Sequence, residues 1–451
     1  MDAAHLDRAA ALLRAGGIVA FPTETVYGLG ANALDPDAVA KVFAAKQRPS
    51  FDPLIVHVAE PAAAWALVDL DPLHRGVRDL PAVLAEAFWP GPLTLVLPKR
   101  PTLDPAAATR WFPGLDRRDP LTQPAPPHPP EDLLKISGNR GVSEIKGGAA
   151  IPGVPGVVTA GLGSVGVRVP GHPVARQLIA AAGVPVAAPS ANPFGGISPT
   201  RADHVAVPCD LILDGGPCAT GVESTVVTPV GPTTDQEQPP HADHRGGLIV
   251  LRWGGISREQ LEAAVAGHGW AVWGPGERKS PPADAERGGA GGAGGTGGPG
   301  GALVSPGTSQ RHYAPRTPLR LVEPGGLAQA IASWQHGRPT TPSAGGGSPT
   351  ATHPGSIAPE TEWGGREESG QGQVGVGVLS LRGLGRGAGV DGRLVEEVLS
   401  EAGDLTAAAA RLFEAMHRLD AVGLEAIFAE AVPEHGLGRA INDRLRRAAA
   451  R

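Results

Sequence analysis

The sequence predicts an α/β protein of two domains, and three features of the chain support this prediction. Short apolar runs of strand length alternate with stretches in which apolar residues recur every three or four positions. Several of the short runs end in clusters of hydroxyl, amide and charged residues, as strands do at a ligand site. Segments rich in Gly and Pro then separate a larger first region from a smaller second one.

The first predicted strand, residues 18–21, leads directly into Pro-Thr-Glu-Thr-Val-Tyr-Gly-Leu-Gly at residues 22–30. A turn that only reversed the chain would need a Gly or an Asn-Gly pair, and not consecutive hydroxyl and carboxylate side chains. The two glycines allow close approach to the backbone. The segment is therefore a candidate ligand site, and the plainer alternative is a polar loop after an edge strand.

A short helix is predicted after this segment. Asp35 is a favourable N-cap, Pro36 suits the first helical position and Pro49 ends the helical stretch. The helix brings Lys46 and Arg48 to its C-terminal end, where cations also serve as simple end caps. Because the two cations follow closely on the polar segment, an anion site is the favoured interpretation.

Later strands also carry polar residues. The next strand carries His57, and Arg168 lies in the middle of the apolar strand at residues 165–170. A buried Arg needs an anionic partner, which is either a protein carboxylate or a ligand carboxylate or phosphate. Pro-Ser-Ala-Asn at residues 189–192 and Gly-Val-Glu-Ser-Thr at residues 221–225 adjoin two more strands, although a Ser-x-Asn also forms simple turns.

The remaining elements extend the α/β pattern. Helices are predicted over residues 174–182 and 257–266, the second opened by a Ser257/Gln260 capping box. The second region has the rhythm of a small Rossmann-like domain. Its strand, helix and strand are predicted over residues 376–381, 405–419 and 424–429.

Biased segments set the domain boundaries. Four of them are rich in Pro, Gly, Ser or charge and suit surface insertions, partly disordered loops or flexible linkers: residues 101–155, 233–247, 288–301 and 335–373. We therefore expect a first domain at residues 1–270, a linker at 271–318 and a second domain at 319–451.

Composition sets broad limits on function. The 451 residues carry a net charge of −6 without a long basic run, so there is no electrostatic case for a nucleic-acid footprint. Cys209 and Cys218 lack a metal or redox spacing and fit a reducing cytosol. No apolar run has the length of a membrane span and no signal peptide is recognisable. We expect a cytoplasmic protein without membrane attachment.

The motifs, in this order, closely resemble the YrdC-like family of threonylcarbamoyl-adenylate synthases. The resemblance is carried by residues 22–30, Lys46 with Arg48, and residues 53–57, 89–94, 167–170, 188–192 and 221–225. Ser-Pro-Gly at 305–307 and His-Tyr-Ala-Pro at 312–315 resemble the linker of the longer members, and residues 436–443 resemble their C-terminal domain. The resemblance implies a twisted open sheet around a concave active site, then the linker and a smaller Rossmann-like domain.

The resemblance also implies an activity, that of a nucleotidyltransferase. L-threonine, bicarbonate and ATP would give threonylcarbamoyl-AMP, pyrophosphate and water, for threonylcarbamoyladenosine modification of tRNA. Mg²⁺ would arrive on ATP, since no carboxylate cluster nominates protein metal ligands. A downstream threonylcarbamoyl transferase and a weak contact with tRNA are the expected partners.

The site residues carried over from the family fall into two groups. The residues expected to bind ATP, of which the first four are also the catalytic set, are Lys46, Arg48, Ser190, Asn192, Ser198, Arg252 and His312. The residues expected to bind L-threonine are Thr23, His57, Thr159, Arg168 and Ser224. The chain departs from the family pattern at Asp52, where Asn is common, and at Trp253, where Pro is common.

The linker is expected to act as a lid. Pro306, Pro315 and Pro318 stiffen it, and His312 and Tyr313 suit it to covering a nucleotide. The alternative is a plain proline-rich spacer. We expect the lid to order when ATP and threonine bind.

Three other functions compete with the synthase. A hydrogenase-maturation carbamoyltransferase contains this domain but needs cysteine-paired zinc motifs, for which two cysteines are too few. An RNA-binding or ribosome-associated module would rely on a basic concave surface. A non-catalytic paralogue is disfavoured because Lys46, Arg48, Ser190 and Asn192 are all present.

Overall fold

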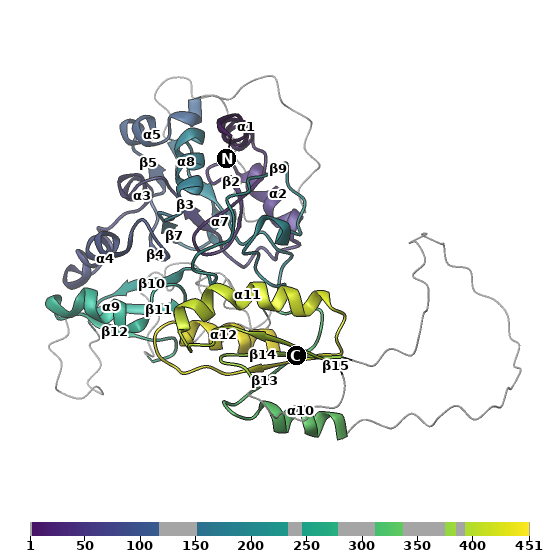
Figure 1. The fold of residues 1–451 in the computed structure, drawn as a ribbon. Helices are drawn as coiled ribbons and strands as arrows, with labels where there is room; N and C mark the ends of the chain where they lie inside the picture. The colour runs from purple at the N-terminus through teal and green to yellow at the C-terminus, as the bar shows by residue number, and fades with distance from the viewer. Residues whose placement is uncertain are drawn as a thin grey trace, which may run out of the picture.

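Two sheets covered by helices, and a third of two short strands, form the described part of the computed structural model. Figure 1 shows the arrangement of these elements. The predicted α/β class and the second, smaller α/β unit are both confirmed. The structure describes residues 2–116, 151–232, 246–277, 312–336, 375–384 and 393–450.

The first sheet is a mixed one of ten strands in the order β12-β11-β10-β4-β7-β3-β8-β2-β1-β9. Its strands are β1 (Val19–Phe21), β2 (Gly28–Asn32), β3 (Ile55–His57), β4 (Leu93–Pro98), β7 (Ser164–Arg168), β8 (Val186–Ala187), β9 (Leu211–Ile212), β10 (Thr225–Val230), β11 (Gly247–Arg252) and β12 (Ala271–Trp273). The central strands β3 and β7 run parallel with His57 opposite Arg168. This register places two predicted site residues side by side.

Helices cover both faces of this sheet because the strand side chains alternate between two apolar clusters. Helices α1 (Ala3–Arg14) and α8 (Pro173–Ala182) pack against one face, over Val19, Phe21 and Val186. The opposite face is covered by α2 (Pro36–Lys46), α3 (Pro61–Leu67), α4 (Leu80–Phe88), α5 (Pro105–Trp111) and α9 (Arg258–Val265).

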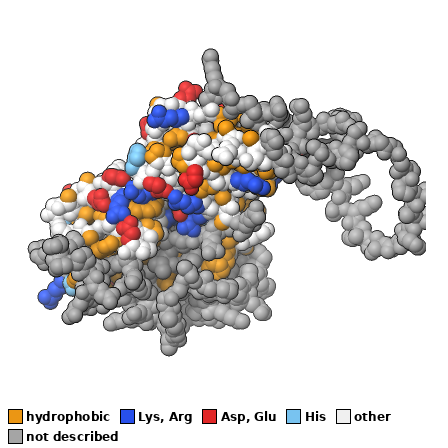
Figure 2. All heavy atoms as spheres, turned by 90° about the horizontal axis from the view of Figure 1, so that it is seen from below, with side chains coloured by type: hydrophobic (Ala, Val, Ile, Leu, Met, Phe, Trp, Pro, Cys, Tyr) orange, Lys and Arg blue, Asp and Glu red, His pale blue; other side chains and the backbone are white. Residues whose placement is uncertain are grey.

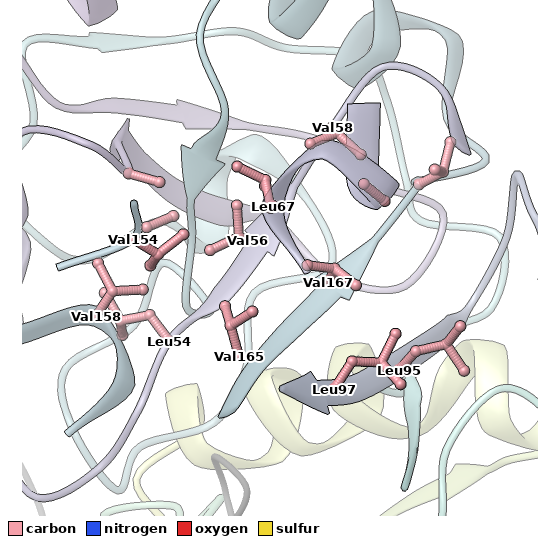
Figure 3. Packing of buried hydrophobic residues seen from close by; sticks show 14 of the residues in the cluster. Leu54, Val56, Val58, Leu67, Leu95, Leu97, Val154, Val158, Val165 and Val167 are labelled. Carbon is pink, nitrogen blue, oxygen red and sulfur yellow. The ribbon is translucent and has the colours of Figure 1, made fainter. Parts of the chain in front are cut away.

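Branched aliphatic side chains fill the centre of the larger cluster. Val56 of β3 and Val165 and Val167 of β7 lie near Leu95 and Leu97 of β4, as Figure 3 shows. Burying each such side chain contributes roughly 1.5–3 kcal/mol. The strands that lead to the site are therefore anchored in the core.

Helix ends follow the predicted capping chemistry. The Asp35 side chain accepts hydrogen bonds from the backbone of Asp37 and Ala38, and Pro36 opens α2. Ser257 and Gln260 form a reciprocal capping box at the start of α9. These caps fix where each helix begins, and Gln47, in the left-handed conformation, ends α2 after Lys46. Within the ranges described, none of the helices is long and apolar enough to cross a membrane.

Both ends of the insertion expected at residues 101–155 are ordered parts of the first domain. Its two ends pair as β5 (Thr102–Leu103) and β6 (Ile151–Pro152), and α5 lies between. Leu103, Ala108 and Phe112 are buried in the main core. These apolar residues tie both ends to the domain, which the Pro-rich composition concealed. Residues 117–150 lie outside the described residues, as do 233–245, 278–311 and 337–374.

The second sheet has four parallel strands in the order β13-β16-β14-β15. Helices α11 (Leu405–Ala421) and α12 (Gly438–Ala449) pack against one face, and α10 (Leu327–His336) against the other. Figure 1 shows α11 between this sheet and the first domain. The strands are β13 (Leu319–Val322), β14 (Gly375–Ser380), β15 (Arg393–Val398) and β16 (Ala426–Glu430).

The two domains share an apolar cluster. Val26 and Val222 of the first domain pack with Phe413 and Met416 of α11, and Tyr313 of the linker belongs to the same cluster. Val26 and Val222 both come from motifs predicted to form the site. The C-terminal domain therefore packs directly against the site loops.

Candidate active site

The predicted motifs meet around one open cavity. Eight of the twelve predicted site residues line it: Thr23, Arg48, His57, Arg168, Ser190, Ser224, Arg252 and His312. Lys46, Thr159, Asn192 and Ser198 do not line it. The lining also includes Thr25, Glu223 and Tyr313, which the sequence prediction did not assign to the site.

Thr23 and Thr25 shape the loop that follows β1. The Thr23 hydroxyl donates to the carbonyl of Val26 at 2.6 Å and lies 2.7 Å from the Thr25 hydroxyl. It also accepts from the amides of Thr25 and Val26, each at 3.2 Å. The hydroxyls of this motif therefore hold the backbone of the loop, and recognition of the amino acid by Thr23 stays a prediction.

Arg168 is paired with a protein carboxylate. Its Nη2 lies 2.7 Å from Glu24 Oε1, and its Nε donates to the carbonyl of Gly91 at 3.2 Å. The second Glu24 oxygen accepts from the amide of Gly171 at 2.9 Å. The sequence left open whether the anionic partner of Arg168 is a protein carboxylate or a ligand. The structure shows a protein carboxylate, that of Glu24, and the Arg168 side chain also lines the cavity.

His57 lies beside Arg168 at the end of β3 and is buried. Burial, and then the Arg168 charge, lower the pKa of His57 to about 3. Its imidazole is therefore neutral at physiological pH. A neutral ring next to a guanidinium can accept a hydrogen bond from an amine or hydroxyl while Arg168 attracts a carboxylate.

Lys46 acts behind the cavity wall. Its Nζ donates to the carbonyls of Ser190 and Asn192, and the side chain is buried. Burial, and then the neighbouring Arg48, lower the pKa of Lys46 well below its ordinary value. The structure thus shows Lys46 holding the Ser190 segment, because its ammonium is directed to these carbonyls and not to the cavity.

Asn192 and Ser198 also support the wall from behind. The Asn192 amide donates to the carbonyls of Pro193 and Gly196 at 2.9 and 2.8 Å, which closes a turn. The Ser198 hydroxyl donates to Glu223 Oε1 at 2.6 Å. The Asn192 amide nitrogen and the Ser198 hydroxyl are thus bound to protein groups, while Asn192 Oδ1 is buried without a hydrogen-bond partner among the described residues. Neither residue lines the cavity, so their contact with the nucleotide stays a prediction.

Arg48 lines the cavity and is fixed by Asp52. Its Nη2 lies 2.9 Å from Asp52 Oδ1, and its Nε donates to the Asp52 carbonyl at 3.1 Å. The carboxylate of Asp52 is fully buried. The departure from the family pattern at this position therefore supplies Arg48 with a charged partner in the protein.

Arg252 and Ser224 meet where β10 and β11 adjoin. Arg252 Nε and Nη2 donate to the Ser224 carbonyl at 3.3 and 3.0 Å, and Nη2 lies 3.2 Å from the Ser224 hydroxyl. That hydroxyl is 2.8 Å from the hydroxyl of Thr94. These contacts orient the Arg252 guanidinium beside Ser224 in the cavity wall.

His312 and Tyr313 of the linker close part of the cavity. The His312 ring is edge-on to Phe194 with centroids 5.9 Å apart, and the Ala314 amide donates to the Gly195 carbonyl at 2.8 Å. Burial, and then Arg48 and Lys46, lower the pKa of His312 well below its ordinary value. The linker thus presents a neutral ring to the cavity. Residues 305–307 lie outside the described residues.

Thr159 does not line this cavity, so its contact with L-threonine stays a prediction. It ends α7 (Gly156–Thr159) and lines a separate cavity with Thr94 and Ser164. Its hydroxyl accepts from Lys99 Nζ and donates to the carbonyl of Leu162, both at 3.0 Å. The short helix after residues 117–150 directs Thr159 into this second cavity.

Glu223 and Arg444 were missed as site residues by the prediction. Glu223 Oε2 accepts from Arg444 Nε at 3.0 Å, and Arg444 comes from α12 of the C-terminal domain. A sequence signal existed, because Arg444 shares the buried stripe of α12 with Ala440 and Ile441. A charged residue on an apolar stripe needs a buried partner, but the sequence does not say which one.

The arrangement suits an anionic ligand with a polar head group. Three arginines, Arg48, Arg168 and Arg252, line one cavity together with neutral imidazoles and hydroxyls. In the described part of the chain, no group of three or more His, Cys, Asp or Glu side chains could hold a metal ion. In the view of Figure 2, basic and acidic side chains are interspersed on the described surface.

Comparisons with known proteins agree with this site. A family model described as "Telomere recombination" matches residues 11–111 and 146–237, and one described as "Threonylcarbamoyl-AMP synthase, C-terminal domain" matches residues 256–450. A threonylcarbamoyl-AMP synthase of Bacillus subtilis is 33% identical over 99% of this chain and 93% of its own length. The synthase of Pyrococcus abyssi is 32% identical over 98% and 92%.

A solved structure extends the likeness to the whole fold. P. abyssi Sua5 complexed with L-threonine matches with a TM-score of 0.62 and 30% identity, covering 98% of this chain and 94% of that chain. Both domains and the linker are thus shared with a protein that binds L-threonine. The chain belongs to the threonylcarbamoyl-AMP synthase family of nucleotidyltransferase enzymes.

Proposed function

We propose that this protein makes threonylcarbamoyl-AMP and pyrophosphate from L-threonine, bicarbonate and ATP, for threonylcarbamoyladenosine modification of tRNA in the cytoplasm. The observation that carries the proposal is the convergence of Arg48, Arg168 and Arg252 on one cavity. All three substrates bring negative charge, so a site that joins them needs several cations. The full-length likeness to the synthases of B. subtilis and P. abyssi supports the same reaction.

The threonine end of the cavity is assigned to Arg168 and its neighbours. The Arg168 guanidinium, which is already paired with Glu24, also attracts the carboxylate of threonine. The neutral His57 ring, with Thr23 and Ser224, supplies hydrogen bonds to the amino and hydroxyl groups. Bicarbonate reacts with the threonine amine, which forms an N–C bond and releases water to leave a carbamate.

The nucleotide end is assigned to Arg48, Arg252 and His312. A carbamate oxygen attacks the α-phosphorus of ATP, and the bond to pyrophosphate breaks with pyrophosphate as the leaving group. Positioning and charge neutralisation supply most of the catalysis in such a step. Mg²⁺ enters with the triphosphate as part of the substrate.

The linker protects the product from water. A mixed anhydride of a carbamate and a phosphate hydrolyses readily, so the site must exclude solvent. His312 and Tyr313 are buried against the cavity, which suits a lid over the nucleotide. We propose that the lid orders fully when ATP and threonine are bound.

The test is to incubate the protein with ATP, ¹³C-bicarbonate and L-threonine. The expected result is pyrophosphate release that depends on threonine, with a ¹³C-labelled threonylcarbamoyl-adenylate detected by mass spectrometry. Pyrophosphate release that ignores threonine would contradict the proposal. Salt-dependent RNA binding without ATP turnover would instead favour an RNA-binding module.

A further inference from the structure

We propose that Arg444 of the C-terminal domain is a positioning residue for the nucleotide end of the active site. Its side chain is completely buried, at 0% exposure, and reaches three parts of the cavity wall. The C-terminal domain would then complete the active site of the first domain. This inference rests on the proposed function, and it adds a residue that no sequence motif of the site contains.

The first contact of Arg444 is with Glu223, which lines the cavity. Arg444 Nε donates to Glu223 Oε2 at 3.0 Å, while the Ser198 hydroxyl donates to Oε1 at 2.6 Å. Burial alone would raise the pKa of Glu223, but the charges of Arg444 and Arg252 hold it below its ordinary value. Glu223 is therefore an anion in the wall of a site for anions, and Arg444 is its charged partner.

The second contact is with the chain next to Arg252. Arg444 Nη1 donates to the carbonyl of Trp253, and Arg252 itself lines the cavity and contacts Ser224. One guanidinium thus joins the segment that carries Glu223 to the end of β11. Displacing Arg444 would release both segments from a common support.

The third contact is with the linker. The Arg444 guanidinium carbon lies 5.3 Å from the centre of the Tyr313 ring, within the range of a cation–π interaction. The ring also stacks on Phe413 of α11, at 5.5 Å between centroids, and lies 4.1 Å from the His312 ring. Tyr313 has a φ of 61°, which non-glycine residues rarely adopt. The C-terminal domain therefore holds the linker residue in an uncommon conformation.

The backbone of α11 reinforces the same arrangement. Gly221, at the start of the Glu223 motif, has a φ of 71°, and a Cβ there would lie 2.4 Å from the Ala409 carbonyl oxygen. The motif and α11 are thus in direct backbone contact. Arg444 acts at an interface that is already closely packed.

The structure offers a matched control in Arg439. It lies on the same helix and also pairs across the domain interface, with its Nη1 3.0 Å from Glu259 Oε1. Unlike Arg444, it is partly exposed, and neither partner lines the cavity. Arg439→Gln therefore removes an interdomain ion pair, together with a contact at 6.0 Å over the Trp253 ring, and leaves the Glu223–Arg444 pair in place.

The experiment measures the KM for ATP, the KM for threonine and kcat in the full chain, with binding of a non-hydrolysable ATP analogue in parallel. Arg444→Met should raise the KM for ATP roughly 10- to 100-fold, because one charged hydrogen bond and the neutralisation of Glu223 are lost. The KM for threonine should change much less. Arg439→Gln should stay within about twofold of wild type for every parameter, as exposed ion pairs contribute little.

A double variant separates positioning from folding. In Glu223→Gln with Arg444→Met no unpaired carboxylate remains, so it should bind ATP better than Arg444→Met alone. The inference would be overturned if the Arg444→Met and Arg439→Gln variants bound ATP with the same affinity. If Arg444→Met does not fold, a folded double variant with wild-type ATP affinity would overturn it equally, and weakened affinity would support it.

The analogue measurement keeps the two proposals apart. If the wild-type protein releases no pyrophosphate with threonine, the proposed function fails. The effect of Arg444→Met on analogue binding would still decide the role of Arg444. If the wild-type protein turns over and Arg444→Met leaves the KM for ATP unchanged, only the role of Arg444 fails.

Discussion

Two buried arginine–glutamate pairs adjoin the cavity, and they depend on different parts of the chain. Arg168 and Glu24 lie 2.7 Å apart and both belong to the first domain. Arg444 and Glu223 lie 3.0 Å apart and join the two domains. The comparison indicates that the first domain alone can build the threonine end of the cavity, whereas the nucleotide end needs the C-terminal domain and the linker.

The largest effect is expected at the threonine end. Arg168→Ala should lower kcat/KM for threonine about 100-fold or more, because a bidentate charged contact is worth roughly 3 kcal/mol or above. Steady-state kinetics with varied threonine measures this. Arg168→Lys is the second variant, since it keeps a positive charge for Glu24 but cannot form the planar contact. An unchanged KM for threonine in Arg168→Lys would contradict the assignment.

The next largest effect is expected at the nucleotide end. Arg48→Ala should lose most activity while the fold survives, since a charged hydrogen bond to phosphate contributes roughly 1.5–3 kcal/mol. Lys46→Ala should also lose most activity, through displacement of the Ser190 segment that Lys46 holds. Circular dichroism and pyrophosphate release together measure both outcomes. Normal turnover in either variant would assign that residue to helix capping.

Much of this comparison was accessible from the sequence. Thr23, His57, Arg168 and Ser224 come from motifs that directly follow, end or precede strands, and register then brings them together. The positions of these residues at strand ends could be predicted because neighbouring residues determine where a strand or a helix ends.

The nucleotide end was less accessible because its contacts are distant in sequence. The Glu223–Arg444 pair spans 221 positions, and nothing near either residue specifies the other. The sequence also could not show that Lys46 and Asn192 support the wall from behind. That depends on the direction of each side chain once α2 and the Ser190 segment are packed.

An effect of similar size is expected for amino-acid choice, which sharpens the assignment of the threonine end. Serine lacks one methyl group, so its kcat/KM should fall roughly 10- to 200-fold. Valine lacks the hydroxyl and leaves buried polar groups unpaired, so its rejection should be stronger than that of serine. Competition assays with pyrophosphate detection measure both. Equal use of threonine and valine would contradict a pocket that recognises the hydroxyl.

The smallest effect is expected at the domain interface away from the cavity. His417 of α11 stacks on His204 with centroids 4.1 Å apart, and burial followed by His204 lowers the pKa of His417 to about 4. The unfolded chain binds a proton more readily, so this contribution to stability is complete above about pH 6.5 and is lost as the pH falls towards about 4.

Unfolding in denaturant at several pH values tests this interface. His417→Gln should flatten the decline in the free energy of unfolding between about pH 6.5 and 4 by roughly 1–3 kcal/mol. Activity at neutral pH should change little, because His417 does not line the cavity. An identical pH dependence in the variant and the wild type would show that this histidine pair does not govern acid stability.

The two-ended cavity is tested most directly by an experimental structure of the protein with L-threonine and a non-hydrolysable ATP analogue. The threonine carboxylate should lie on Arg168, beside His57. The phosphates should lie between Arg48 and Arg252, covered by His312, with Glu223 still bound to Arg444. A threonine carboxylate on Arg252, or a nucleotide bound without contact to Arg48 and His312, would contradict the assignment of the two ends.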